Sequence, residues 1–513
     1  MTQRQHAADG RFRPWVSRHQ GWLWPALPAI AWLVRYATLY GLPGRSPAFW
    51  ASWFDQGRYM QSAVAFSHGD LSASAHWYPL GYSLLAAPFV WLSPADPFVW
   101  LDLLLFVATA MAFLRAMQVI GIGRPIALVV FVATTLVYPQ LARTWVQPWN
   151  STLSAALLWW LIARTAEISS DSDGAPPAPT PRAMVLLGVL AGALPLVRPM
   201  DGLLSFLCLA VAALALWRRG QLTGRAMICV AAGLCLPAAP YVALHLAIYG
   251  PHPSAYHIAL ADTGFVFADL GWKAYVLLIT PRPWFPDTRS ILEAMPWIIP
   301  GLAGLIAAPI IARADARRAA MLMLLAAILV SAIPFIAFVD LQPPGLWRFK
   351  NIHYFKWMMP LFGIGILMLW RALRGPESRP IAIGVTVCVL LPLGIRIAPV
   401  AVAEAQPARM LMFRGDSTRD WNQAYYGVAT LTDNIGVQHN VSDYHQMPDA
   451  IGVRAIAVRR LFGRDPRRDD PGEPRAFATG ARPYARYGQA VSFGLPCWIA
   501  PAACALPGDP GGR

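Results

Sequence analysis

Long apolar runs, separated by short polar loops, are the feature that most constrains this chain. Segments of roughly 20 apolar residues recur along it, and a helix of that length crosses the hydrocarbon core of a bilayer. Lipid offers no hydrogen bonds, so a spanning segment must satisfy its backbone groups internally, as a helix does. Only 13% of the 513 residues are charged, whereas a soluble protein has about 25%. The sequence therefore predicts an all-α integral membrane protein.

Twelve apolar segments are candidates for membrane helices. They lie at 22–42, 80–93, 98–120, 125–140, 150–163, 184–197, 200–217, 226–248, 290–312, 319–339, 354–370 and 380–399. The segment 80–93 is short, contains Pro88 and lies between Pro79 and Pro94, so we expect an interfacial helix in the first outer loop. The remaining segments predict about eleven transmembrane helices.

Arginine clusters predict the orientation in the membrane. With a cytoplasmic N-terminus, the inner loops receive most of these clusters, in agreement with the positive-inside rule. They comprise Arg115, Arg124, Arg164, Arg182, Arg218, Arg219, Arg225, Arg313, Arg317, Arg318, Arg371, Arg374 and Arg379. The inner loop 165–183 is rich in Ser, Asp, Gly and Pro, which predicts a disordered cytoplasmic linker. The outer side receives a first periplasmic loop at 43–79 and a large one at 250–289.

The chain divides into two predicted domains. A polytopic membrane domain covers 1–399, and a more polar tail at 400–513 predicts a small C-terminal extramembrane domain. With eleven spans this tail is periplasmic, and with one span fewer it is cytoplasmic. Cys497 and Cys504 would permit a disulfide if the tail faces an oxidising compartment, and would otherwise stay free thiols.

The net charge of +15 comes almost entirely from arginine, because the only lysines are Lys273, Lys350 and Lys356. The arginines are dispersed among loops, which favours contacts with membrane lipids or phosphates and argues against nucleic acid. Richness in arginine and alanine with little lysine is typical of a GC-rich bacterial genome. The predicted location is therefore the bacterial cytoplasmic (inner) membrane.

The first outer loop has the densest polar cluster beside a membrane segment. Asp55-Gln56-Gly57-Arg58-Tyr59 is followed by His68, Asp70, His76 and Tyr78-Pro79-Leu80-Gly81-Tyr82. A carboxylate at the bilayer surface can take a proton from a hydroxyl nucleophile, and a neighbouring arginine can hold an anionic leaving group. Asp55 and Arg58 could equally form a helix-surface pair at i and i+3. The two histidines fit no metal-site spacing and are expected to be loop residues.

These segments resemble those of a known enzyme class. An arginine near the outer end of the first helix (Arg35), the acidic motif at 55–59 and the Tyr-Pro-x-Gly-Tyr-x-Leu-Leu segment at 78–85 resemble the polyprenyl-phosphate-dependent glycosyltransferases of the GT-C class. That class includes protein O-mannosyltransferases and lipid A aminoarabinose transferases, and the similarity of layout extends over about the first 400 residues. Many relatives have a second carboxylate where this chain has Gln56, which argues against a metal site built on paired acids.

The resemblance implies a reaction at the periplasmic face. A sugar would pass from a polyprenyl-phosphate donor to a hydroxyl of a lipid, glycan or protein, with Asp55 as the catalytic base. A polyprenyl phosphate leaves as an anion and needs no general acid, unlike the leaving group in glycoside hydrolysis. The predicted mechanism therefore requires no cofactor and no metal.

Donor-phosphate or substrate binding needs cations and aromatic side chains near the outer helix ends. The candidates are Arg58, Tyr59, Tyr78, Tyr82, Arg143, Arg198, Arg282, Arg348, Lys350 and His353. Charges at membrane depth are costly without a partner, which marks them as functional candidates. Long basic side chains can instead snorkel to lipid headgroups, and we expect this of Arg289 and Lys356.

Two other functions remain open at this point. A transporter or flippase of an anionic or lipid-linked substrate would place polar residues in mid-helix and tends to show repeated halves, and the sequence shows no clear internal repeat. An O-antigen ligase or polymerase would depend on a large late loop. The sequence has no Gly-x-x-x-x-Gly-Lys-Ser/Thr loop and no His-Glu-x-x-His, which argues against an ATP-driven pump and a zinc protease.

Overall fold

The computed structural model describes most of the membrane domain and two short strands beyond it. The described residues are 13–41, 54–170, 178–263, 265, 267, 270, 274–280, 289–312, 315–338, 341, 343–397, 410–414 and 426–430. Predictions on Arg282, Cys497 and Cys504 lie outside these residues, and so does the folding of the tail apart from its two strands.

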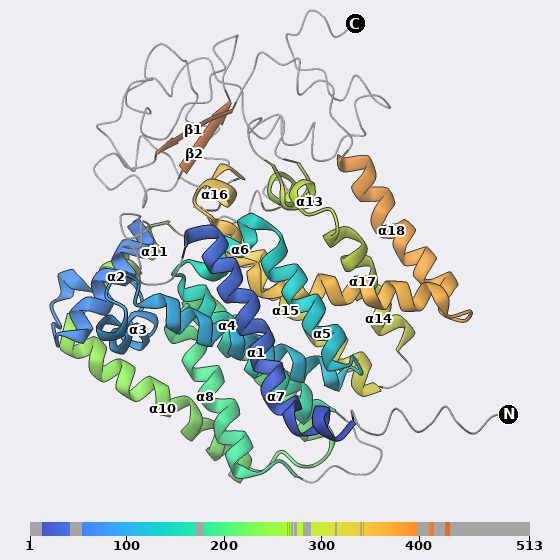
Figure 1. Ribbon diagram of the computed structural model, residues 1–513, viewed down its shortest axis with the longest axis horizontal. Helices are drawn as coiled ribbons and strands as arrows, with labels where there is room; N and C mark the ends of the chain where they lie inside the picture. The colour runs from blue at the N-terminus through green and yellow to red at the C-terminus, as the bar shows by residue number, and fades with distance from the viewer. Residues whose placement is uncertain are drawn as a thin grey trace, which may run out of the picture. The chain divides into compact units, whose positions relative to one another are not determined.

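The chain forms two compact units. Figure 1 labels the helices and strands that belong to them. Unit 1 comprises 1–252, 312–324 and 356–360. Its elements are α1 (Arg13–Tyr40), α2 (Phe54–Ser67), η2 (Ala73–Ala75), α3 (Leu80–Leu92), α4 (Phe98–Val119), α5 (Arg124–Val132), the π-helix η3 (Ala133–Val137), α6 (Pro139–Val146), α7 (Asn150–Ser169), α8 (Pro181–Val197), η4 (Pro199–Asp201), α9 (Gly202–Arg218), α10 (Gly224–Tyr249) and η7 (Lys356–Met358).

Unit 2 comprises 253–311, 325–355 and 361–513. Its elements are α11 (Ala255–Thr263), the π-helix η5 (Tyr275–Ile279), α13 (Ile291–Ala294), α14 (Ile298–Ile311), α16 (Pro343–Arg348), η6 (Asn351–Tyr354), most of α17 (Met359–Arg374), α18 (Arg379–Ile397), β1 (Met410–Arg414) and β2 (Tyr426–Thr430). The two strands pair antiparallel, with Met410 opposite Thr430. Helix α15 (Asp315–Ala337) begins in unit 1 and ends in unit 2.

The protein is a multi-pass helical membrane protein. Among the described residues, five helical segments are long and apolar enough to cross a bilayer: Phe98–Val119, Pro199–Arg218, Gly224–Tyr249, Arg317–Ala337 and Lys356–Arg374. A sixth would be the pair Arg124–Val137 and Pro139–Val146, which is bent by 96°. Helix α3 is a short apolar helix of 13 residues, the length expected for the interfacial segment. The count of about eleven spans stays a prediction.

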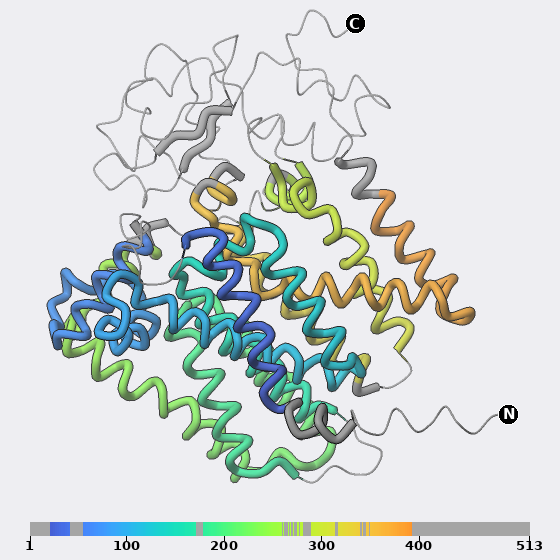
Figure 2. The backbone as a smooth tube through the Cα atoms, in the orientation of Figure 1, coloured from blue at the N-terminus to red at the C-terminus, as the bar shows by residue number. Residues whose placement is uncertain are grey.

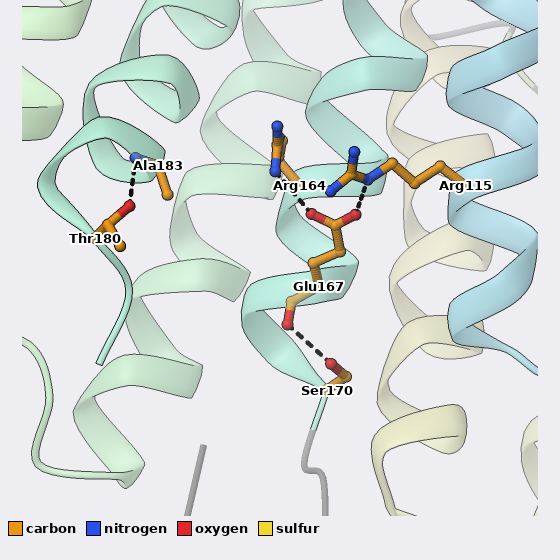
Figure 3. Close-up of polar contacts among 6 residues, drawn as sticks. All are labelled: Arg115, Arg164, Glu167, Ser170, Thr180 and Ala183. Atoms are coloured by element: carbon orange, nitrogen blue, oxygen red, sulfur yellow. Dashed lines mark hydrogen bonds and ion pairs between the residues drawn. The ribbon is translucent and has the colours of Figure 1, made fainter. Parts of the chain in front are cut away.

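The linker predicted over 165–183 is shorter than expected, because α7 continues through Ser169 and α8 begins at Pro181. Figure 3 shows the polar contacts that stabilise the end of α7 and the start of α8. Near the end of α7, Glu167 pairs with Arg115 of α4 and with Arg164. At the start of α8, the Thr180 hydroxyl accepts the Ala183 N–H at 3.3 Å as an N-cap. The prediction of a linker over 165–183 is therefore wrong at both ends.

Helices α8 and α10 run side by side in unit 1, as the tube in Figure 2 also shows. Their backbones approach so closely that a Cβ added at Gly188 would collide with the Val230 carbonyl oxygen, and one added at Gly233 with that of Val185. Small residues allow such close approach between membrane helices, where lipid provides no hydrophobic drive for association. In unit 2, Gly304 and Gly365 meet in the same way.

Candidate functional site

The two segments of the first-loop motif meet in space. Asp55 lies in the first turn of α2, and Tyr78 lies two residues before α3 begins. The Tyr78 hydroxyl donates a short hydrogen bond to Asp55 Oδ1. Asp55 is partly exposed. Its carboxylate is therefore held in place by a tyrosine while staying partly accessible.

An aromatic cluster extends from this contact into the interior of unit 1. The ring of Tyr59 lies 4.7 Å from that of Tyr78 and 5.3 Å from that of Tyr82, measured between centroids. Phe98, at the start of α4, lies 4.7 Å from Tyr82. Tyr59 and Tyr82 are buried. The predicted site residues Asp55, Tyr59, Tyr78 and Tyr82 thus form one continuous set of contacts.

Arg58 lies on the same helix as Asp55, at the edge of this cluster. Its Nη1 donates to Gln61 Oε1 at 3.0 Å, and its guanidinium carbon lies 5.8 Å from the ring centroid of Trp77. The guanidinium is therefore held beside an aromatic face, next to the segment that carries Tyr78. This placement leaves a positive charge within one helical turn of the carboxylate.

Gln56 has a structural role that a second carboxylate could not fill. Its side chain is buried, and its Nε2 donates to the Pro148 carbonyl oxygen at 3.1 Å. A carboxylate has no N–H to donate and would face that carbonyl with like partial charge. Pro148 lies in the turn 147–149, which joins α6 to α7.

A second buried carboxylate lies deeper, on α4. Asp102 Oδ1 accepts a hydrogen bond from the Tyr82 hydroxyl at 2.7 Å, and that hydroxyl accepts the Trp149 N–H at 3.1 Å. Asp102 is 1% exposed, and its Oδ2 has no hydrogen-bond partner in the part of the chain that the structure describes. Tyr82 therefore connects the aromatic cluster to turn 147–149 and to a buried acid.

Lys356 contradicts the prediction that it snorkels to headgroups. Its side chain is 0% exposed, and its Nζ donates to the Thr144 carbonyl oxygen and to Thr152 Oγ1, both at 2.7 Å. The ammonium also lies 4.6 Å from the ring centroid of Trp145 and interacts electrostatically with Asp102. Interior hydrogen bonds hold this lysine where the sequence predicted lipid contact.

Two further predicted arginines lie near helix ends in unit 1. Arg198 is buried in the break between α8 and α9, with its Nη1 3.7 Å from Asp201 Oδ2. Arg143, in the last turn of α6, interacts electrostatically with the hydroxyl of Tyr40, as does Arg35. Arg198 thus has an acidic partner, and Arg35 and Arg143 both act electrostatically on the Tyr40 hydroxyl.

The remaining predicted cations belong to unit 2. Lys350 is buried, has a φ of 60° and precedes η6, where the His353 side chain is buried against the ring of Tyr354, 4.2 Å away between centroids. The side chain of Arg348 and the whole of Arg282 lie outside the described residues. The structure thus joins Asp55, Arg58 and the tyrosines locally, and it describes Lys350 and His353 in a separate unit.

The loop between α2 and α3 is pinned by His76. Its ring nitrogens contact Ser62 Oγ at 2.8 Å and the Asp70 carbonyl oxygen at 2.9 Å, and its own carbonyl accepts the Tyr249 hydroxyl at 2.7 Å. The Asp70 carboxylate is exposed, and the Ser72 backbone N–H holds its pKa below the ordinary value. His76 is therefore a structural residue. Among the described residues, no three His, Cys, Asp or Glu side chains gather as metal ligands would.

Sequence reasoning missed Asp102 and misread Lys356. Asp102 is the only acidic residue in the apolar run 98–119, and a lone acid in such a run signals function or a buried partner. Lys356 gave no such signal, because its partners Thr144 and Thr152 lie more than 200 residues earlier in the chain. A contact at that separation is set by the fold and not by local spacing.

Comparison with known proteins gave few matches. No family model and no curated protein matches the chain. The crystal structure of ArnT from Cupriavidus metallidurans bound to undecaprenyl phosphate matches with a TM-score of 0.46 and 16% identity, over 76% of this chain and 67% of that one. The apo structure of the same protein matches with a TM-score of 0.35 and 17% identity, over 76% and 66%.

Proposed function

We propose that this protein is a membrane glycosyltransferase, which moves a sugar from a polyprenyl-phosphate donor to a hydroxyl of a lipid, glycan or protein at the periplasmic face. The observation that carries the proposal is the hydrogen bond from Tyr78 to Asp55. It joins the two motif segments, which lie 23 residues apart in sequence. Their side chains then continue as one aromatic cluster, so the motif forms a site and not two unrelated surface features.

The chemical step assigns one task to each group. Asp55 takes the proton of the acceptor hydroxyl, and the acceptor oxygen forms a bond to the anomeric carbon of the sugar. The bond between that carbon and the phosphate oxygen breaks, and its electron pair leaves with the polyprenyl phosphate. The leaving phosphate carries its own negative charge, so nearby cations are enough to stabilise it.

Arg58 is the cation that supports this step most directly, because it lies one helical turn from Asp55 beside Trp77. Arg143 and Arg35 are proposed for the donor phosphate, since both act electrostatically on the same hydroxyl, that of Tyr40. Phosphate oxygens accept several N–H donors at once, which arginine offers in a fork geometry. Arg198 is assigned a smaller part, because Asp201 already offsets its charge.

The positions of buried charges favour an enzyme over a transporter. Among the described residues, the buried charged side chains are Asp96, Asp102, Arg198, Asp201, Lys350 and Lys356. Each lies at a helix end, in a break between helices or within the first turns of a helix. A transporter site near the bilayer midplane would instead need polar groups in the middle of the spans.

The test is replacement of Asp55 by Asn in the purified full-length protein. With a polyprenyl-phosphate sugar and a lipid acceptor, we expect transfer to fall by about 10²- to 10⁴-fold, because the general base is lost. The matched control is Asp70→Asn, which removes an exposed carboxylate from the same loop and should leave transfer unchanged. Near-normal turnover by Asp55→Asn, at equal membrane expression, would remove Asp55 from the mechanism.

The face and the substrates need two further measurements. A cysteine at position 55 should react with a membrane-impermeant maleimide added from the periplasmic side. Labelling only from the cytosol would place the base in the wrong compartment. Lipid extracts of a strain lacking this gene should lack one sugar modification, which would identify both the donor sugar and the acceptor.

A further inference from the structure

Lys356 ties together the two helices on either side of turn 147–149. Its ammonium donates to the carbonyl of Thr144, in the last turn of α6, and to the hydroxyl of Thr152, in the first turn of α7. Carbonyls in the last turn of a helix have no partner within the helix, and a cation is favourable there. Lys356 therefore closes the end of α6 and fixes how α7 leaves it.

Asp102 is an acid buried almost as fully as Lys356. The two side chains interact electrostatically, and both are at most 1% exposed. A buried charge left without its partner is strongly unfavourable. Asp102 also accepts the Tyr82 hydroxyl, so the same carboxylate serves Lys356 and the aromatic cluster.

Turn 147–149 is held from the other side by residues of the proposed site. Gln56, next to Asp55 in the chain, donates to the Pro148 carbonyl, and the Tyr82 hydroxyl accepts the Trp149 N–H. The turn is thus fixed between Lys356, which binds both flanking helices, and the helix that carries the proposed base.

We propose that Lys356 and Asp102 are positioning residues, which hold turn 147–149 and thereby set the place of Asp55 through Gln56 and Tyr82. The catalytic consequence rests on the proposed function, whereas the mechanical coupling is a property of the fold alone. Neither side chain touches the substrate. A displacement of about 1 Å at a reacting group costs on the order of 10²-fold in rate, so a loosened turn should affect the chemical step.

The experiment combines exchange and kinetics on the full-length protein in nanodiscs. Lys356→Met and Asp102→Asn are compared with Arg115→Met and Glu167→Gln, which break an ion pair between α4, the helix of Asp102, and α7, the helix of Thr152 (Figure 3). Hydrogen–deuterium exchange is followed in peptides covering 54–67 and 147–152. In Lys356→Met and Asp102→Asn, we expect both peptides to exchange faster than in the unmodified protein. In Arg115→Met and Glu167→Gln, we expect both peptides to exchange at the rate of the unmodified protein.

Kinetics then separate positioning from ligand binding. We expect Lys356→Met to lower kcat on the order of 10²-fold, with the donor KM little changed, since a group that acts only through geometry does not bind the ground state. A raised donor KM with normal kcat would make Lys356 a donor ligand and overturn the proposal. Native exchange in both peptides in Lys356→Met and Asp102→Asn would also overturn it.

A double variant covers the case in which a single replacement does not fold. Lys356→Met combined with Asp102→Asn leaves no uncompensated charge, so it should fold with near-native thermal stability. The proposal requires that it still shows fast exchange at 147–152 and low kcat, because Thr144 and Thr152 have lost their donor. Native exchange and rate in the double variant would overturn it. If the unmodified protein shows no transfer, the proposed function fails, while the exchange measurement still decides the coupling.

Discussion

The α8–α10 contact and the contacts around turn 147–149 are both buried in unit 1, yet they depend on different groups. Helices α8 and α10 approach through glycine, and a side chain at Gly188 or Gly233 would collide with backbone. Turn 147–149 is held by polar side chains, including Gln56, Tyr82 and Lys356. The α8–α10 contact requires residues without a side chain, whereas turn 147–149 requires particular hydrogen-bond donors and acceptors. Replacements in the first region should therefore act through packing, and those in the second through geometry at the site.

The largest effect on stability is expected at the α8–α10 contact. Gly233→Leu places a side chain against the Val185 carbonyl, where backbone cannot yield. Overpacking of this severity should cost about 3 kcal/mol or more. Thermal unfolding in detergent measures it, with Gly224→Ala as the control, because a Cβ there meets nothing within 4 Å. A native melting temperature for Gly233→Leu would mean that α8 and α10 can separate without cost.

Helix positions in both regions could be predicted from the sequence because apolar length specifies them. The segments 98–120 and 226–248 agree closely with α4 (Phe98–Val119) and α10 (Gly224–Tyr249). The segment 125–140 was predicted as one span, whereas the chain forms α5 and a π-helix and then bends by 96° into α6. Pro139, at the start of α6, is the residue in the sequence that signals this break.

The next effect is pH-dependent and comes from another buried polar contact of unit 1, between Asp96 and Tyr36. Asp96, just before α4, accepts the Tyr36 hydroxyl at 2.6 Å, and burial raises its pKa from 3.8 to about 6. Between these values the folded chain holds a proton that the unfolded chain has lost, so the free energy of unfolding falls as pH rises. The contribution is present below about pH 4 and lost above about pH 6, and it amounts to about 3 kcal/mol.

Asp96→Asn tests this assignment, because asparagine still accepts the Tyr36 hydrogen bond but has no proton to lose. Melting temperatures are measured from pH 7.5 down to pH 5 for both proteins. The unmodified protein should gain stability on acidification relative to Asp96→Asn. Parallel curves for the two proteins would show that Asp96 has an ordinary pKa.

Tyr82→Phe should have an intermediate effect on stability. It should also show most clearly that the contacts around turn 147–149 affect transfer, unlike the α8–α10 contact. It removes a hydroxyl that donates to Asp102 and accepts from Trp149, leaving two buried groups without their partner, at a cost of about 2 kcal/mol. The matched control is Tyr249→Phe, which loses a single hydrogen bond to the His76 carbonyl. Tyr82→Phe should also lower transfer more than Gly224→Ala does. Equal melting temperatures for the two tyrosine variants would contradict the double role of the Tyr82 hydroxyl.

The candidate site could be predicted in part for a physical reason. Asp55, Tyr59, Tyr78 and Tyr82 lie close together in sequence, on α2 and at the start of α3, so local spacing was enough to group them. Lys356 could not be grouped with them, because its place depends on how α6 and α7 fold back. Gln56 appeared in the sequence only as a missing carboxylate, whereas its amide donates a hydrogen bond to the Pro148 carbonyl.

The smallest effect on stability is expected at the N-terminal caps of α8 and α10. The Thr180 hydroxyl caps α8 by accepting the Ala183 N–H at 3.3 Å, and the Thr223 hydroxyl caps α10 by accepting the Ala226 N–H at 3.2 Å. Replacing either threonine by alanine should cost about 1 kcal/mol, because one N–H of the first turn loses its acceptor. Hydrogen exchange should rise in the first turn of the affected helix and stay native at 147–152, and transfer should be unchanged. Faster exchange at the turn in these variants would show that the two regions are coupled, contrary to the distinction drawn between them.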